Sequence, residues 1–252
     1  MAFNQLFLNH LVSAINVVDS RRHLAHHKKT LASIGYPDLF IKKTPQSSNL
    51  FGKFSSCFLS NEKALRWHNL SEHKYAFFSI EKFVSLKGWG FDYLDIEEGT
   101  GASNQSFKKV DLNESITEAM YSKYDILIDS GTAEHCFNIG KVFENYFHLL
   151  KPGGIVLQFI PFLSPNHGFW SINPTAVFDL SSCNPIKITH CGLTAYSSYH
   201  DYFDCNGLSI DIDPVRRFGI EVKMNSIILC FFSYKKLSKA IFKFPVQHKY
   251  RK

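Results

Sequence analysis

The second half of the chain alternates between buried-strand runs and a segment with helical periodicity. YDILIDS (residues 124–130) is apolar and β-branched, which predicts a strand buried on both faces. The next segment, NIGKVFENYFHLL, places its apolar residues along one helical face: Val142, Phe143, Tyr146, Phe147 and Leu150. KPGG (residues 151–154) is expected to end that helix, and GIVLQFIPF predicts a second buried strand. This order indicates a βαβ unit with parallel strands.

Further strands are predicted on either side of this unit. Upstream, TLASI is expected to form a strand that ends at a Gly-Tyr-Pro-Asp turn. Residues 90–96 (GFDYLDI) and 107–113 (FKKVDLN) are two more candidates, each with an acidic residue near its end. Downstream, SIILCFFSY predicts a last strand, and PIKITHCGL is a candidate within the less regular residues 181–217. Residues 46–83 are expected to be mainly helical.

One domain is expected from the length and composition. The chain has 252 residues, of which 45% are hydrophobic and 24 are phenylalanine, enough for one large aromatic core. The expected domain spans residues 1–252, with an N-terminal helical extension at about 1–28 and an insertion at about 40–85. The longest apolar run, residues 227–232, is too short to cross a bilayer, and the N-terminus lacks a signal-peptide pattern. We therefore expect a cytoplasmic protein.

Cysteine spacing and net charge bear on whether disulfides, a metal ion or a nucleic-acid partner are expected. The six cysteines include no C-x-x-C pair, so buried thiols are expected rather than disulfides. His190, Cys191, His200 and Cys205 are candidate zinc ligands, but their spacing matches no closed tetrahedral site. No metal is therefore expected. The net charge of +6 is concentrated in RRHLAHHKK (residues 21–29) and in the C-terminal tail. Solvated helix faces explain these basic runs without a nucleic-acid partner.

YLDIEEGTGAS (residues 93–103) resembles the first strand and glycine turn of class I S-adenosylmethionine-dependent methyltransferases, although Glu97 replaces the first glycine. Spacing argues against this assignment. At about 30 residues per βαβ unit, strand one should lie roughly 60–90 residues before strand four. Asp95 lies only 30 positions before Asp125, whereas Gly35 lies 90 positions before it. We therefore assign TLASI to strand one, and YLDI, KKVDLN and YDILIDS to strands two, three and four.

A more specific resemblance covers residues 111–180. The segment contains DSGTAEH, the KPGG turn, a strand that ends in proline, and NHGF, in this order. It resembles a group of class I methyltransferase-like proteins that is widespread in bacteria. In that group a short turn with one glycine often replaces the glycine-rich first turn, as Gly-Tyr-Pro-Asp would here. The resemblance implies an α/β, Rossmann-like three-layer sandwich with a mostly parallel seven-stranded sheet whose last strand is antiparallel, and S-adenosyl-L-methionine as cofactor.

The resemblance implies a cofactor site at the carboxyl ends of the strands, where doubly wound sheets bind ligands. Gly35 would let the backbone approach the cofactor, or else be a simple turn residue. Asp95 would accept hydrogen bonds from both ribose hydroxyls, or else be a surface acid. Asp111 would lie near the adenine, or else cap a helix. The full cofactor-binding set comprises Gly35, Tyr36, Asp95, Ile96, Asp111, Leu112, Asn113, Asp129, Ser130 and Gly131.

The acceptor is expected next to DSGTAEH and to the loop that follows strand five. His135 could remove a proton from an acceptor hydroxyl, because histidine ordinarily titrates near neutrality. Glu134 and His167 are the other candidate catalytic residues. Methyl transfer needs mainly alignment, so these side chains could instead be structural. Asn166, Phe169 and Trp170 offer a polar group beside an aromatic wall for the substrate, or else pack as a lid.

These features favour a methyltransferase that acts on a hydroxyl or amine of a small polar or sugar-linked acceptor. The loss of the glycine-rich turn favours the alternative of a catalytically inactive binding or assembly protein. The basic segments favour, more weakly, an RNA methyltransferase. A small molecule or carbohydrate is therefore the expected partner, rather than nucleic acid.

Overall fold

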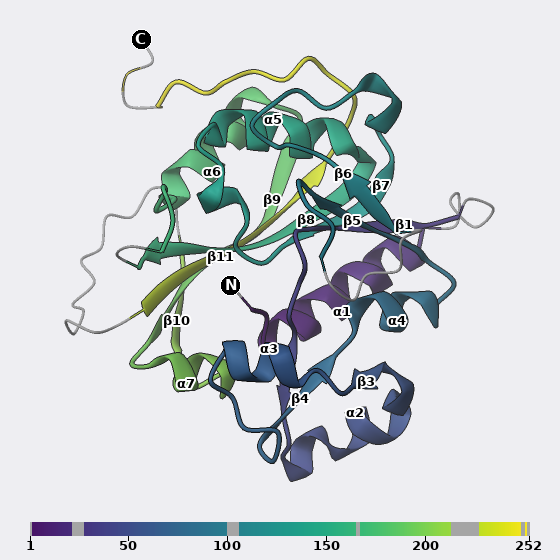
Figure 1. Cartoon of the computed structure of the whole chain (residues 1–252). Helices are drawn as coiled ribbons and strands as arrows, with labels where there is room; N and C mark the ends of the chain where they lie inside the picture. The colour runs from purple at the N-terminus through teal and green to yellow at the C-terminus, as the bar shows by residue number, and fades with distance from the viewer. Residues whose placement is uncertain are drawn as a thin grey trace.

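A large β-sheet forms the centre of the computed structural model, which describes residues 2–21, 28–99, 106–164, 167–212, 227–247 and 250 (Figure 1). Within these residues the sheet has eight strands. In spatial order they are β10 (Leu208–Asp211), β9 (Ile186–Tyr196), β11 (Ile227–Lys236), β8 (Leu150–Leu163), β7 (Tyr124–Asp129), β1 (Thr30–Ile34), β5 (Gly90–Asp95) and β6 (Phe107–Lys109).

Strand β1 occupies the middle of the parallel part of the sheet. It pairs with β5 on one side, where Thr30 lies opposite Gly90, and with β7 on the other, where Leu31 lies opposite Ile126. Strands β6 and β8 extend the parallel part on its two sides. The assignment of TLASI, YLDI, KKVDLN and YDILIDS to strands one to four is therefore confirmed. This is the order of a doubly wound, Rossmann-like sheet.

The antiparallel part of the sheet has one strand more than expected. β11 runs antiparallel between β8 and β9, which confirms a last strand of opposite direction. β10 adds a further antiparallel strand beside β9, so the described residues form eight strands where seven were expected. All four residues of β10 are exposed, so its sequence carries no buried apolar pattern that could have predicted it.

Helices cover both faces of the sheet and complete a three-layer sandwich (Figure 1). Apart from the short helices within residues 45–67, the described helices are α1 (Gln5–Asp19), α4 (Ile80–Ser85), η4 (Glu118–Met120), η5 (Ala133–His135), α5 (Ile139–Leu149), α6 (Pro174–Cys183) and α7 (Tyr199–Phe203). One face of the sheet carries α1 and α4, and the other carries α5 and α6. The alternating side chains of β1 serve both cores, because Leu31 packs on the α1 side whereas Ala32 and Ile34 pack on the α5 side.

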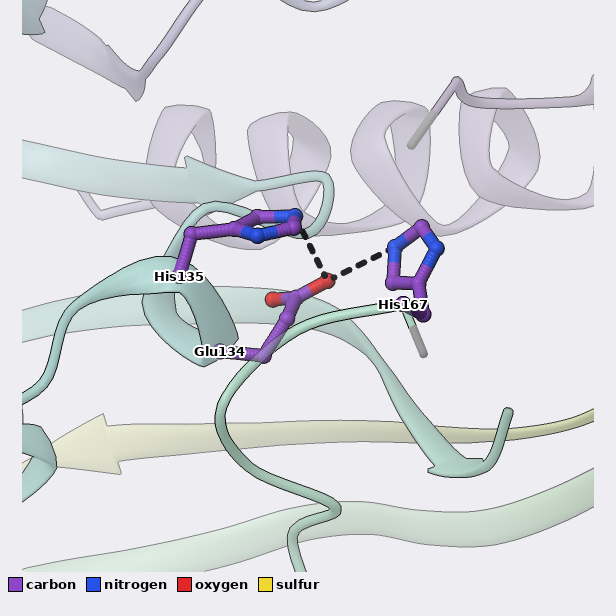
Figure 2. Close-up of side chains that lie close together, drawn as sticks. All are labelled: Glu134, His135 and His167. Atoms are coloured by element: carbon purple, nitrogen blue, oxygen red, sulfur yellow. Dashed lines mark ion pairs between the residues drawn. The ribbon is translucent and has the colours of Figure 1, made fainter. Parts of the chain in front are cut away.

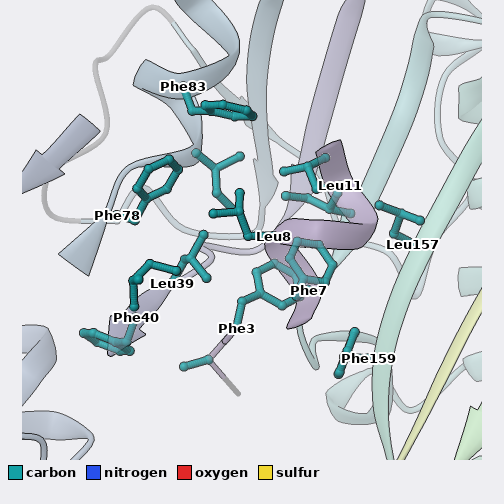
Figure 3. Close-up of a cluster of buried hydrophobic side chains, with 14 of the residues drawn as sticks. Phe3, Phe7, Leu8, Leu11, Leu39, Phe40, Phe78, Phe83, Leu157 and Phe159 are labelled. Atoms are coloured by element: carbon teal, nitrogen blue, oxygen red, sulfur yellow. The ribbon is translucent and has the colours of Figure 1, made fainter. Parts of the chain in front are cut away.

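Helix α1 is anchored at its N-terminus and along its apolar face. The Asn4 side chain accepts a hydrogen bond from the backbone N–H of Phe7 and donates one to the carbonyl of Tyr202 (2.8 Å). Phe3 and Phe7 stack on each other, and both rings meet Phe159 of β8 edge-on (Figure 3). The N-terminal helix therefore packs on the sheet and forms part of the core.

Residues 40–85 connect β1 to β5 and form a small α/β segment. It contains a three-stranded antiparallel sheet in the order β2-β4-β3. Besides α4, its elements are β2 (Phe40–Lys42), η2 (Pro45–Ser47), α2 (Ser48–Lys53), η3 (Ser55–Cys57), β3 (Phe58–Leu59), α3 (Glu62–Trp67) and β4 (Tyr75–Phe78). The expected helices are present but short, and the strands were not expected. Each strand has at most four residues, too few to show a period of two.

The end of α5 and the cysteines refine the expectations from the sequence. α5 ends at Leu149 and its C-cap Leu150 is extended, so KPGG lies within β8 and does not itself end the helix.

All six cysteines are free thiols, as expected, but only Cys57, Cys191 and Cys230 are buried. None of the helices in the described residues is both long and apolar enough to cross a membrane.

His10 on α1 should make the stability of the fold depend on pH. Its ring lies near His190 and Phe231, and burial, followed by the charge of nearby His190, lowers the pKa of His10 to about 4 from the ordinary 6.5. As the pH falls, the unfolded chain therefore gains this proton before the folded protein does. The free energy of unfolding should fall by about 1–2 kcal/mol as the pH falls from 6.5 to about 4. This is less than the full pKa shift of His10 corresponds to, because the ring is partly solvated.

Urea unfolding near pH 7 and pH 4.5 measures this dependence in the wild type, in His10→Gln and in the exposed control His73→Gln. We expect only His10→Gln to reduce the difference between the two pH values. An equal pH dependence in all three proteins would contradict the role assigned to His10.

Candidate functional site

Three strand ends meet at Gly35, directly after β1. The φ angle of Gly35 is +72°, and its backbone N–H donates to the Leu94 carbonyl (2.9 Å). A Cβ at this position would lie 2.5 Å from Thr132 Oγ1 and 3.8 Å from Asp95 Oδ2. A side chain would therefore collide with the turn after β7, so both conformation and space require glycine. Gly35 occupies the switch point at which doubly wound sheets bind their ligands.

Tyr36 and Gly99 pack together beside this point. The ring of half-buried Tyr36 stacks on Tyr93, with 4.8 Å between the ring centroids. Gly99 approaches so closely that a Cβ on it would lie 2.7 Å from the Tyr36 ring. The EEGTG segment thus follows strand two, as predicted, and its first glycine allows close packing on Tyr36. Gly101 lies outside the described residues.

Asp95 ends β5 with one carboxylate oxygen in use and the other available. Its Oδ1 accepts hydrogen bonds from the backbone N–H groups of Ile96 (2.6 Å) and Glu97 (3.4 Å). Its Oδ2, near Gly35, receives no hydrogen bond from the described residues. Burial raises the pKa of Asp95 above its ordinary value, although the two backbone bonds oppose this shift. The Ile96 side chain is exposed, so a ligand can reach this strand end.

The segment after β6 is attached to α5. Asp111 Oδ1 accepts hydrogen bonds from the backbone N–H and the side-chain amide of Asn113 (2.9 and 3.0 Å). Asn113 Oδ1 accepts from the backbone N–H of Asn138, the N-cap of α5 (3.0 Å). Leu112 is 4% exposed and belongs to the core, which leaves little of it for a ligand. ESITEAM forms only η4, so Asp111 closes a turn rather than capping an α-helix.

Asp129, at the end of β7, is fully occupied by the protein itself. Its Oδ1 accepts hydrogen bonds from the backbone N–H groups of Gly131 (3.0 Å) and Thr132 (2.8 Å). Its Oδ2 accepts from the Tyr146 hydroxyl (2.9 Å) and the Gln158 amide (2.8 Å). Gly131, with a φ angle of +98°, makes the sharp turn possible. Asp129 therefore shapes this turn, and its carboxylate has no free position for a ligand.

Sequence reasoning missed the partners of Asp129. Tyr146 and Gln158 match no motif, yet each is a polar residue within an otherwise apolar run, which is the signal that could have found them. Burial, followed by the charge of nearby Glu134, raises the pKa of Asp129 to about 6. Ser130 is 4% exposed and lies in the interior. The turn after β7 thus contains two neighbouring buried carboxyl groups.

Glu134, His135 and His167 form a compact polar cluster at the same edge of the sheet (Figure 2). The first two residues lie in η5, and His167 lies in the loop after β8. Glu134 Oε1 is 3.4 Å from His167 Nε2 and 4.0 Å from His135 Nε2. The Glu134 side chain has 0% exposure, and neither carboxylate oxygen has a hydrogen-bond partner among the described residues. Burial lowers the pKa of His135, although Glu134 opposes this shift.

The loop at residues 167–170 is fastened to Glu134 by its backbone. The Glu134 carbonyl accepts hydrogen bonds from the N–H groups of Phe169 (2.8 Å) and Trp170 (3.3 Å). Gly168 lies so close that a Cβ on it would be 2.8 Å from Glu134 Cγ and 2.9 Å from the Glu134 carbonyl oxygen. The three candidate catalytic residues are therefore brought together by a fixed contact between two loops.

An exposed aromatic cluster lies beside the polar cluster. The Trp170 indole N–H donates to the carbonyls of Cys136 and Phe137 (3.1 Å each). The Phe137 ring meets Phe169 edge-on, with 5.6 Å between the ring centroids. Phe137, which sequence reasoning missed, is 71% exposed and Phe169 is 65% exposed. Trp170 thus holds the loop in place while Phe169 faces outward, and Asn166 lies outside the described residues.

A surface depression of about 390 Å³ lies at the opposite edge of the sheet. It is lined by residues at the amino ends of β1 and β5, including Thr30, Trp89 and Asp92. Doubly wound sheets bind their ligands at the carboxyl ends of the strands, so we place the candidate site at Gly35.

Comparison with known proteins adds only distant structural likeness. No family model matches the chain, and no curated protein matches its sequence. A SAM-dependent methyltransferase from Methanosarcina mazei is similar at 12% identity and a TM-score of 0.41, with 86% of this chain and 96% of that chain covered. A 1,6-didemethyltoxoflavin-N1-methyltransferase from Burkholderia thailandensis, with S-adenosylhomocysteine bound, is similar at 9% identity and a TM-score of 0.42, with 93% and 82% covered. At these TM-scores the likeness carries no argument, and the fold assignment rests on the strand order.

Gly168→Ala should destabilise the protein by about 1–3 kcal/mol, because the added Cβ would push against Glu134. The matched control is Gly52→Ala in α2, where a Cβ would meet nothing within 4 Å. That change should stabilise the protein by about 0.5–1 kcal/mol, because alanine favours the helix. Urea unfolding measures both effects. Unchanged stability in Gly168→Ala would contradict the close contact between the two loops.

Proposed function

We propose that the protein is a methyltransferase that uses S-adenosyl-L-methionine and methylates a hydroxyl or amine of a small polar or sugar-linked acceptor. The observation that carries the proposal is the arrangement at Gly35, with the available Asp95 Oδ2 beside it at the switch point of the sheet. A nucleoside cofactor needs close backbone approach and a carboxylate for its ribose hydroxyls. The motif resemblance of residues 111–180 supports the same class of enzyme.

The ends of β1, β5 and β6 would hold the cofactor. Gly35 would admit the cofactor next to the backbone, and Asp95 Oδ2 would accept a hydrogen bond from a ribose hydroxyl. Tyr36 and Ile96 would contact the nucleoside from either side of this carboxylate. Exposed Asp111 would lie near the adenine. Residues 129–131 would act differently, because their turn supports the pocket through the bonds of Asp129.

The polar cluster would receive the acceptor and its proton. S-adenosyl-L-methionine supplies an electrophilic methyl group when bound, so the protein must align the acceptor with it. His167 Nδ1 would take the proton of an acceptor hydroxyl or amine, and buried Glu134, 3.4 Å from His167 Nε2, would stabilise the resulting imidazolium. His135, on the other side of Glu134, would orient the acceptor by a hydrogen bond.

The aromatic cluster would bind the apolar part of the acceptor. Phe169 and Phe137 are largely exposed next to the polar cluster, so a flat or ring-shaped molecule can cover them while its polar groups reach His167. A sugar ring has this combination of an apolar face and polar edges. The arrangement therefore supports a small polar or sugar-linked acceptor.

Asp95→Asn should weaken the binding of S-adenosylhomocysteine roughly 10- to 100-fold, because a charged hydrogen-bond acceptor is lost at the ribose. Isothermal titration calorimetry measures the Kd. The matched control is Asp92→Asn on the same strand, whose carboxylate accepts from the Tyr124 hydroxyl (2.8 Å) away from the site. This control should bind normally. The proposed function is wrong if the wild type binds neither S-adenosylhomocysteine nor S-adenosylmethionine at millimolar concentration.

Gly35→Ala should weaken cofactor binding at least about 10-fold, because the collision with Thr132 Oγ1 would displace the end of β1. The control is Gly88→Ala, which has a similar φ angle of +75° but no atom within 4 Å of an added Cβ. Both changes should cost about 1–2 kcal/mol of stability through the positive φ angle, and Gly35→Ala should cost more because of the collision. Calorimetry should show lost affinity in Gly35→Ala only, and equal affinity in both variants would contradict the placement of the cofactor.

A further inference from the structure

Glu134, His135 and His167 present the donor set of a metal site. We propose that these three side chains bind one divalent ion of the zinc or iron(II) class. Two imidazole nitrogens and one carboxylate oxygen suit such ions, whereas Mg²⁺ and Ca²⁺ prefer oxygen ligands alone. The expectation of no metal considered only the region from His190 to Cys205. Within the described residues, the cluster is the one group of this kind.

The distances between the donor atoms fit a single ion with little movement. The three atoms lie within 4.8 Å of one another, and Figure 2 shows both imidazoles turned toward Glu134. Ligands bound at about 2.0–2.1 Å in a tetrahedron lie roughly 3.3 Å apart. His167 Nε2 already lies 3.4 Å from Glu134 Oε1. His135 Nε2, at 4.0 Å, belongs to a half-exposed side chain that can close the remaining gap by rotation.

Glu134 lacks the partners that a buried carboxylate needs. Its side chain has 0% exposure, and neither of its oxygens, nor His167 Nε2, has a hydrogen-bond partner among the described residues. Burial of a carboxylate without donors is costly, and a bound cation removes this cost. Asp129, five positions earlier, receives four hydrogen bonds from the protein. The protein thus supplies hydrogen-bond donors to Asp129 but none to Glu134, which leaves the Glu134 carboxylate for a ligand.

The backbone holds the two ligand-bearing loops together, and the two imidazole side chains are partly exposed to solvent. The Glu134 carbonyl accepts from the Phe169 N–H (2.8 Å), which ties the two ligand-bearing loops together. The His135 N–H donates to the Thr132 carbonyl (3.0 Å). The side chains of His135 and His167 are 47% and 31% exposed, so an ion can enter from solvent and keep a free coordination position. Three protein ligands with an open position characterise catalytic rather than structural zinc sites.

Such an ion narrows the class of acceptor. It would bind an acceptor hydroxyl and lower the pKa of that hydroxyl, so that the proton passes to solvent. The oxygen would then bond to the methyl carbon while the methyl–sulfur bond of S-adenosyl-L-methionine breaks, and S-adenosylhomocysteine would leave with the electron pair of that bond. His135 and His167 would then be ligands, and the ion would replace proton removal by an imidazole. The preferred acceptor therefore has a hydroxyl that can coordinate the ion at its free position. This use of the ion rests on the proposed function, whereas binding of the ion does not.

The experiment titrates the full-length, chelator-treated protein with Zn²⁺ by calorimetry and with Co²⁺ by visible absorption. We expect one ion per chain, Co²⁺ bands typical of four or five ligands, and much weaker binding of Mg²⁺. Glu134→Gln and His167→Gln should each weaken Zn²⁺ binding at least about 100-fold, because each removes a ligand. The matched control is His148→Gln on α5, whose ring stacks on Tyr121 away from the cluster and should leave affinity unchanged.

Circular dichroism and thermal unfolding check that each variant folds. If Glu134→Gln does not fold, the half-exposed His135→Gln replaces it in the same titration. Absence of Zn²⁺ and Co²⁺ binding in the wild type, or equal affinity in wild type and folded cluster variants, would overturn the metal site. S-adenosylhomocysteine binding to the metal-free protein is measured alongside. If the protein binds S-adenosylhomocysteine but no metal, only the metal site is contradicted. If it binds metal but no S-adenosylhomocysteine, only the proposed function is contradicted.

Discussion

The parallel pairing of β1 with both of its neighbours is the constraint on which the candidate site depends. Ile34 lies opposite Asp129 of β7 and is also paired with β5, so the residues that follow all three strands reach the same edge. At the other end, buried Asp125 fixes this register by accepting hydrogen bonds from the Thr30 N–H (2.9 Å) and from Lys151 Nζ (2.6 Å). A slip by one residue would exchange the side chains that belong to the two cores. The position of the site is therefore decided by packing on both faces of the sheet, far from any ligand.

The two buried carboxylates of the turn after β7 have different roles, because one is bonded to the protein and the other is not. Asp129 accepts four hydrogen bonds, and these bonds consume its capacity to act on a ligand. Glu134 has comparable burial and no such donors, so only a proton, a protonated histidine, a ligand donor or a cation can complete its surroundings. Burial, and after it the charge of Glu134, raises the pKa of Asp129, which is the electrostatic cost of placing both carboxyl groups there. Because Asp129 fixes the turn, Glu134 can stay without donors of its own while the turn keeps its shape.

Sequence patterns predict the centre of this fold better than its margins. Chain spacing places Gly35 after strand one and Asp95 after strand two, because βαβ units have a nearly constant length. The exposed β10 and the very short strands of residues 40–85 lack the periodicity on which such predictions depend. Glu134 and His167 could each be found as polar residues near strand ends, but 33 positions separate them. The sequence therefore predicts that both lie on the acceptor side of the sheet, but only the folded loop shows that their side chains come within 3.4 Å of each other.

The contact between the two loops has a consequence for how the proposed acceptor would enter. A loop that closed over the site as a lid would have to break the hydrogen bond between the Phe169 N–H and the Glu134 carbonyl and to withdraw Gly168 from its close packing. Both contacts hold the loop against the turn after β7, where the proposed acceptor would bind. Thr132 of that turn also donates a hydrogen bond to the Ile34 carbonyl next to Gly35 (3.1 Å), so the sheet would set the distance between the proposed cofactor and the proposed acceptor. Since methyl transfer depends mainly on alignment, a fixed geometry of this kind would suit the proposed reaction.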